Sequence, residues 1–147
     1  MAQHIWTVPC RFSMTDRETN NMSLIEVLEQ FTVPAVPPKQ PNRALVPAIF
    51  DVVTLWGRDD DEQEEDSFGR LSLISPNGET LLEYPYQIDL RENKRFRSAA
   101  RIVGVPARQT GRYQFRIEQR GAANDEWQAV ASIPLIVKQR TPAAAEA

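Results

Sequence analysis

Side chains capable of nucleophilic or metal chemistry are scarce, because the 147 residues contain one histidine, His4, and one cysteine, Cys10. A cysteine nucleophile needs a base within hydrogen-bond reach. If the N-terminal segment is a strand, the two side chains share a face but lie about 20 Å apart. A Cys–His pair and a zinc site, which needs several Cys or His ligands, are therefore excluded within one chain. We expect Cys10 to be buried beside Val8 and Phe12, and His4 to be exposed.

An acidic segment runs from residue 58 to 66, where seven of nine residues are Asp or Glu. Carboxylate oxygens are suitable calcium ligands, and Asp59, Asp61 and Asp66 are the candidates. The segment lacks the ligand spacing and the central glycine of an EF-hand loop. We expect a solvated loop between two strands, and we keep calcium-dependent binding as an alternative.

Basic residues concentrate between positions 91 and 120, where nine Lys or Arg residues face two Glu residues. Guanidinium groups suit phosphate or carboxylate partners, so a basic sheet surface could bind anions or nucleic acid. The candidate residues are Arg97, Arg101, Arg112 and Arg116. The alternative is that the arginines pair across strands with acids such as Glu83 and Asp89.

No signature of a cofactor or catalytic site accompanies these charges. The six glycines are scattered singly, so no phosphate-binding loop is present. Tyr113 and Phe115 alternate with polar residues and are expected to face the core, which leaves them unable to stack on bases. We therefore expect no catalytic residue, no cofactor and no enzymatic activity.

Apolar residues recur with a period of two along most of the chain, which predicts strands rather than helices. The clearest set is Trp127, Ala129, Ala131, Ile133, Leu135 and Val137. Similar alternation covers residues 6–14, 25–33, 82–90 and 113–117, and residues 45–56 are apolar on both faces, as in a central strand. Residues 68–75 and 96–104 complete the set. The pattern predicts an all-β fold, an antiparallel β-sandwich of about eight strands with immunoglobulin-like architecture.

The connections support this fold class. Asn77-Gly78 between two alternating segments predicts an antiparallel hairpin with a type I′ turn. Five prolines between Val33 and Pro47 predict an extended crossover between the two sheets. For Met22–Gln30, a strand is preferred over a short helix.

The length suits one domain, which we assign to residues 1–140, followed by a disordered tail at 141–147. The N-terminal residues show no secretory signal, and no apolar run reaches the roughly 18 residues of a membrane-spanning helix. Because a single cysteine cannot form an internal disulfide, we expect a reducing, cytoplasmic location.

Gly111-Arg112-Tyr113 is typical of the start of a late strand whose tyrosine hydroxyl bonds back to the preceding corner, as in immunoglobulin domains. Four segments, taken in order, resemble a family of small bacterial proteins of unknown function. They are the N-terminal strand ending in Cys10, Met22–Val27, the turn Ser75–Gly78 and the strand Gly111–Ile117. The resemblance implies a β-sandwich with no assigned active site, in which the acidic segment is an insertion.

The function indicated is a non-enzymatic protein-interaction or structural module. We expect a protein partner or self-association rather than a membrane. Two alternatives stay open, namely an anion or nucleic-acid binder that uses the four arginines, and calcium-dependent binding by the acidic segment.

Overall fold

The computed structural model describes residues 1–33, 46–106 and 109–139, which form nine strands and no helix. In chain order the strands are β1 (Gln3–Thr15), β2 (Met22–Val27), β3 (Gln30–Val33), β4 (Val46–Gly57), β5 (Glu65–Ile74), β6 (Thr80–Leu90), β7 (Arg95–Val105), β8 (Gly111–Arg120) and β9 (Gln128–Gln139). The expected all-β class is confirmed. None of the described residues belongs to a helix long and apolar enough to cross a membrane.

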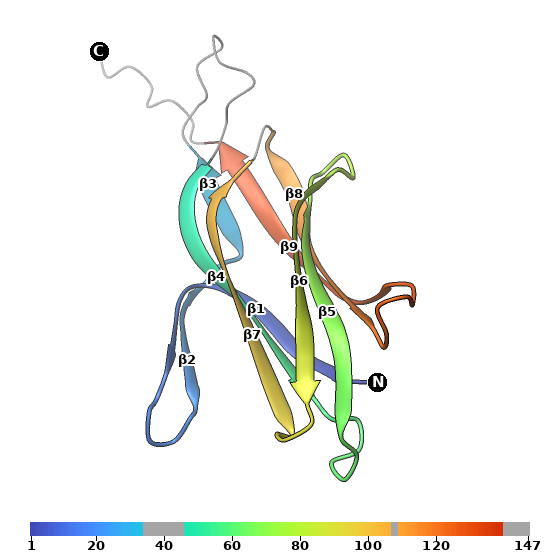
Figure 1. The fold of residues 1–147 in the computed structure, drawn as a ribbon. Helices are drawn as coiled ribbons and strands as arrows, with labels where there is room; N and C mark the ends of the chain where they lie inside the picture. The colour runs from blue at the N-terminus through green and yellow to red at the C-terminus, as the bar shows by residue number, and fades with distance from the viewer. Residues whose placement is uncertain (34–45, 107–108, 140–147) are drawn as a thin grey trace, which may run out of the picture.

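The strands form two sheets, shown in Figure 1. Sheet A has four strands in the order β2-β1-β4-β7, and sheet B has five in the order β3-β9-β8-β5-β6, curled into a half-barrel. The expected count of eight is wrong because residues 25–33 are not one strand: β2 belongs to sheet A and β3 to sheet B. The expectation of purely antiparallel pairing is also wrong, because β3 and β9 run parallel.

The shared core lies between the two sheets and is dominated by aromatic side chains. The largest fully buried ones are Trp56, Tyr113, Phe50 and Phe115. The indole nitrogen of Trp56 in sheet A donates to the hydroxyl of Tyr86 in sheet B at 3.0 Å. Because a buried indole N–H needs an acceptor, this bond both satisfies the indole and links the sheets.

Strand β4 is buried on both faces, as expected for a central strand. Phe50, Val52 and Trp56 point into the shared core, while Asp51 and Val53 on the opposite face are also buried. The second cover is the hairpin of β1 and β2. Strand β1 bends after it has paired with β4, so that this hairpin hangs beside the rest of sheet A (Figure 1).

The β5–β6 hairpin is antiparallel as predicted, but its turn differs from the predicted type I′. The Gly78 amide donates to the Ser75 carbonyl at 3.0 Å, so Pro76 and Asn77 are the central residues. Only Gly78 in this loop has a positive φ, of 88°. Pro76 fixes a negative φ at the first central position, which favours a type I turn followed by a left-handed glycine.

The predicted tyrosine contact at the start of β8 is confirmed. The Tyr113 hydroxyl donates to the Gln109 carbonyl, four residues upstream, at 2.6 Å. Burial raises the pKa of this hydroxyl, which keeps it protonated as the donor. The bond fixes the corner that precedes β8.

The connection between β3 and β4 passes from sheet B to sheet A, since β3 ends at Val33 and β4 begins at Val46. The proline-rich crossover expected there lies mostly outside the described residues. The tail expected at 141–147 lies outside them as well.

Gly69, in the middle of β5, lies opposite Tyr86 in β6. A Cβ atom at position 69 would lie 2.5 Å from two carbons of the Tyr86 ring. The ring cannot move aside without disturbing its bond to Trp56. The close approach of the ring therefore requires glycine at this position.

We predict that Gly69→Ala lowers the free energy of unfolding by about 1–3 kcal/mol, the usual cost of overpacking a core. Urea denaturation followed by fluorescence measures the change. Gly121→Ala is the control, since a Cβ there lies no closer than 3.4 Å to the Asp125 carboxylate. Equal stability of the two variants would contradict the packing described.

Candidate functional site

The four candidate anion-binding arginines do not form one surface. Arg97 and Arg101 lie on β7 of sheet A, whereas Arg112 and Arg116 lie on β8 of sheet B. Each pair lies on the face of its sheet turned away from the shared core, here called the outer face. Because the two outer faces point in opposite directions, a single basic surface made of all four residues is wrong.

Arg97 contacts the β1–β2 hairpin directly, and Arg101 binds Asp51, which in turn binds the hairpin. The Arg97 guanidinium donates to the Asn20 carbonyl and, at 3.4 Å, to the Thr15 hydroxyl, both in the hairpin. Arg101 pairs with the Asp51 carboxylate at 3.2 Å. That carboxylate also accepts a bond from the Ser13 hydroxyl at 2.9 Å. Arg101 is therefore paired with an acid across strands, as the alternative supposed, whereas Arg97 binds a hydroxyl and a carbonyl. The acids named in that alternative pair with other arginines, Glu83 with Arg70 and Asp89 with Arg91.

On sheet B, a bulge changes which side chains face outward. The β8–β9 register shifts between Ile117 and Glu118, so that Ile117 lies opposite Ala131 and Glu118 opposite Ala129. One extra residue on β9 moves the side chains beyond it to the other face. The expected apolar face is thus confirmed from Ala131 to Val137, since Leu135 and Val137 lie in the core and Ala131 and Ile133 pack against it. It is wrong for Trp127 and Ala129, which lie beyond the bulge.

Trp127 lies on the outer face of sheet B between two cations. The guanidinium carbons of Arg70 and Arg120 lie 4.5 and 4.2 Å from the ring centroid. Arg70 also makes a two-pronged contact with the Glu118 carboxylate, with the shortest distance 2.9 Å. The alternating pattern alone could not predict this cluster. The only signal in the sequence was the high arginine content of β8, the strand that contains Glu118 and Arg120.

The acidic segment forms the loop between β4 and β5. Arg58 donates to the carbonyls of Asp61 and Leu90, and Arg95 lies 3.6 Å from the Asp61 carboxylate. Among the residues the structure describes, no group of three His, Cys, Asp or Glu side chains could hold a metal ion. The candidates Asp59, Asp61 and Asp66 are therefore not gathered into a calcium site there.

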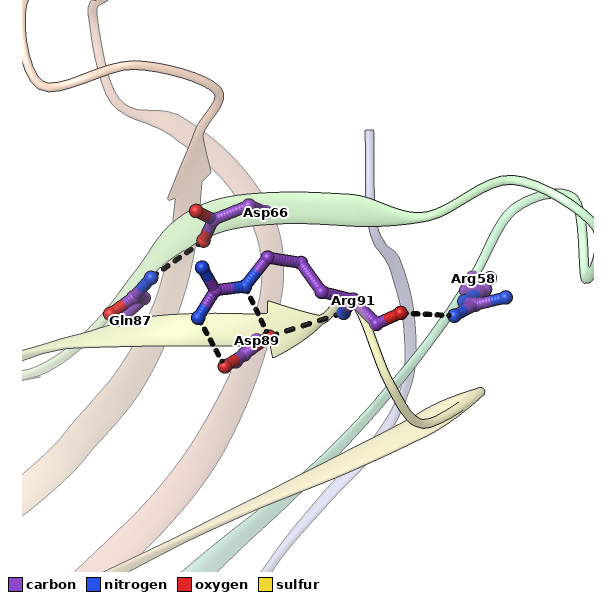
Figure 2. A network of polar contacts seen from close by, with 5 residues as sticks. All are labelled: Arg58, Asp66, Gln87, Asp89 and Arg91. Atoms are coloured by element: carbon purple, nitrogen blue, oxygen red, sulfur yellow. Dashed lines mark hydrogen bonds and ion pairs between the residues drawn. The ribbon is translucent and has the colours of Figure 1, made fainter.

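Figure 2 shows how like charges are kept apart at this end of sheet B. Asp66 and Asp89 lie directly opposite each other in the β5–β6 register, an arrangement that is unfavourable without partners. Asp66 accepts a bond from the Gln87 amide at 2.8 Å, and Asp89 binds Arg91 through both oxygens. The Arg91 carbonyl in turn accepts from Arg58.

Hydrogen bonds from the Arg91 side chain and backbone lower the pKa of Asp89 to about 2. A carboxyl whose pKa is lower in the folded state than in the unfolded chain stabilises the folded state at pH values above its ordinary pKa. This contribution to stability is lost as the pH falls toward about 2. We predict that Arg91→Gln raises the pKa of Asp89, because the side-chain hydrogen bonds and the positive charge of Arg91, which lower this pKa, are lost. Carboxyl-carbon NMR titration measures the shift. An unchanged Asp89 titration in the variant would contradict the assignment.

His4 and Cys10 are separated as expected, but for a different reason. A bulge between His4 and Trp6 turns His4 toward the core, where its ring packs edge-on against Trp56 at 5.4 Å. The side chain is partly buried, so the expectation of an exposed His4 is wrong, and this burial lowers its pKa. Cys10 is fully buried, as expected, and burial raises the pKa of its thiol, with a further contribution from the Asp51 charge. A thiol held protonated is a poor nucleophile.

An exposed apolar surface, which the sequence did not predict, lies on the β1–β2 hairpin. Phe12 lies opposite Ile25, and the four large apolar side chains of the hairpin face, Phe12, Met14, Ile25 and Val27, are 43–55% exposed. Alternation had placed Phe12 in the core together with Cys10. In the structure the two differ, because Cys10 is fully buried while Phe12 is 54% exposed.

No family model matches the chain, and no curated protein matches it. The geometry of the described residues therefore carries the functional argument alone.

Proposed function

We propose that this protein is a non-enzymatic interaction module that docks a protein partner on the hairpin face. The observation that carries the proposal is the exposure of four large apolar side chains on one hairpin. A group of exposed apolar side chains of this size is typical of a protein-binding surface.

The backbone beside the hairpin face supports the same function. Within the described part of the chain, strand β2 is an edge of sheet A and pairs only with β1. An exposed edge offers unpaired N–H and C=O groups that can accept an added strand. The regular part of the edge is Met22–Ile25, because the next residue, Glu26, has a φ of 56°. The partner would therefore supply a short extended segment with apolar side chains.

We also make proposals about the fold type and the cellular location. We propose that the two sheets form a β-sandwich of immunoglobulin-like architecture, which the Tyr113 corner supports. The resemblance to a bacterial family of unknown function and the cytoplasmic location stay predictions. The absence of enzymatic activity is part of the proposal, since it rests on the chemistry of His4 and Cys10 given above.

The test compares two pairs of substitutions on exposed apolar residues. Phe12→Thr with Ile25→Thr removes the centre of the hairpin face and places threonine, which suits strands, at both positions. The matched control is Ile49→Thr with Val103→Thr, a cross-strand pair on the β4 and β7 outer face that is 61% and 70% exposed. Both variants should keep the wild-type thermal midpoint to within a few degrees.

We predict that a partner captured from the host binds the hairpin variant at least about tenfold more weakly, since burying two such side chains contributes about 1.5–3 kcal/mol each. Binding of the purified partner is measured by calorimetry, and hydrogen exchange should show new protection of the β2 amides in the complex. Equal loss of affinity in the control variant, or no protection of β2, would refute the docking site. Sedimentation velocity identifies the case in which the partner is a second copy.

A further inference from the structure

Strand β8 carries three arginines on the outer face of sheet B that have no acidic partner among the described residues. Arg112, Arg116 and Arg120 recur at intervals of four residues along this strand, which corresponds to about 13 Å between neighbours. The acids beside them are Glu118 and Glu83, which lie 2.9 and 3.9 Å from Arg70. Among the described residues, none of the three β8 arginines forms an ion pair or a side-chain hydrogen bond.

Arg120 is held in place without using its hydrogen-bonding capacity. Its guanidinium lies 4.2 Å from the ring centroid of Trp127 and 6.0 Å from that of Phe68. Its buried Nε atom has no partner among the described residues. Stacking against an aromatic ring fixes the plane of a guanidinium while its in-plane N–H groups stay able to bind a carboxylate. Arg120 is therefore preorganised for an anionic group.

The surroundings of Arg116 leave room for a ligand. In the two register pairs that include Arg116, the opposite residues are Ser72 in β5 and Ser132 in β9. Their short side chains do not rise above the exposed arginine. An extended chain lying along β8 could thus contact Arg116 and Arg120 together.

We propose that the outer face of sheet B binds an extended acidic segment of a partner protein, with Arg116 and Arg120 each binding a carboxylate beside Trp127. Carboxylates four residues apart in an extended peptide are also about 13 Å apart, which matches the two arginines. This site lies on the opposite sheet from the hairpin face and does not depend on it.

The chemistry favours a peptide over nucleic acid. The Trp127 ring is already packed against two guanidinium groups, so it is not free to stack on a base. Glu83 and Glu118 lie on the same face and would repel a continuous row of phosphates. The net charge of the chain, −3, also opposes a polyanion. A peptide can place neutral residues at the positions that face the two glutamates.

The probe is a fluorescein-labelled peptide of serine and threonine with a glutamate at every fourth position. We expect it to bind the full chain at low salt in fluorescence anisotropy, and to shift the Trp127 indole N–H signal in NMR spectra. Arg116→Gln and Arg120→Gln should each weaken binding by about tenfold, the usual cost of a charge-assisted hydrogen bond. Arg17→Gln, which removes one exposed positive charge from the β1–β2 turn, should leave binding unchanged.

Arg116→Gln keeps the test valid if Arg120→Gln disturbs the fold, because the Arg116 side chain is exposed; thermal midpoints of both variants are measured. Equal binding by wild type and both variants, or equal binding of a peptide with glutamine in place of glutamate, would overturn the proposal. Tighter binding of a thymidine oligonucleotide would overturn it in favour of nucleic acid. Self-association abolished by Arg116→Gln would assign the face to a second copy instead.

Discussion

Each strand has two faces, and only one of them can point into the core shared by the two sheets. In sheet A, one face of β4 places Phe50, Val52 and Trp56 in this core. In sheet B, the inward side chains of β8 lie in the same core. Whatever lies on the outer faces must be stabilised by other means or stay exposed to solvent. The positions of the candidate binding surfaces follow from this constraint.

On sheet A, the hairpin covers part of the outer face, while Ile49 and Val103 stay exposed. Asp51 is buried and joins three elements, because it binds Ser13 of the hairpin and Arg101 of β7. The hairpin that provides this cover has two faces as well. Its inner side includes the half-buried Leu24, while Phe12 and Ile25 lie on the outside, where none of the described residues covers them.

On sheet B, the outer face is stabilised by charge and aromatic stacking. Arg70, Glu118 and Trp127 form one cluster, in which a nearly buried carboxylate and an indole ring share a single guanidinium. Cations over an indole face are favourable when partly shielded from water. The Trp127 ring of this cluster also stacks on the Arg120 guanidinium and holds its orientation. The same aromatic contact thus stabilises the sheet and orients Arg120 toward a ligand.

The sequence was informative where alternation runs without interruption. Tyr113, Phe115 and Ile117 are fully buried as their pattern indicated, and the hairpin at Asn77-Gly78 forms between the predicted strands. Alternation was misleading where one extra residue or a bend intervenes, since a single-residue shift moves every following side chain to the other face. That is why Trp127 and His4 were assigned to the wrong faces.

The sequence also could not predict which of the two sheets each strand joins. Arg101 and Arg112 are eleven positions apart, yet they lie on different sheets, because the chain crosses between β7 and β8. Local patterns describe each strand but not its neighbours. The strand order decides which residues lie beside each arginine. It therefore also decides which arginines form ion pairs within the described residues and which do not.

The binding site proposed on sheet B requires Trp127 to lie on the outer face between two arginines. A nuclear Overhauser spectrum of the labelled protein measures this placement. We predict cross-peaks from the Trp127 indole protons to the side-chain protons of Arg70 and Arg120. Cross-peaks from Trp127 to Leu135 and Tyr113 in their place would put the indole in the core and contradict the account.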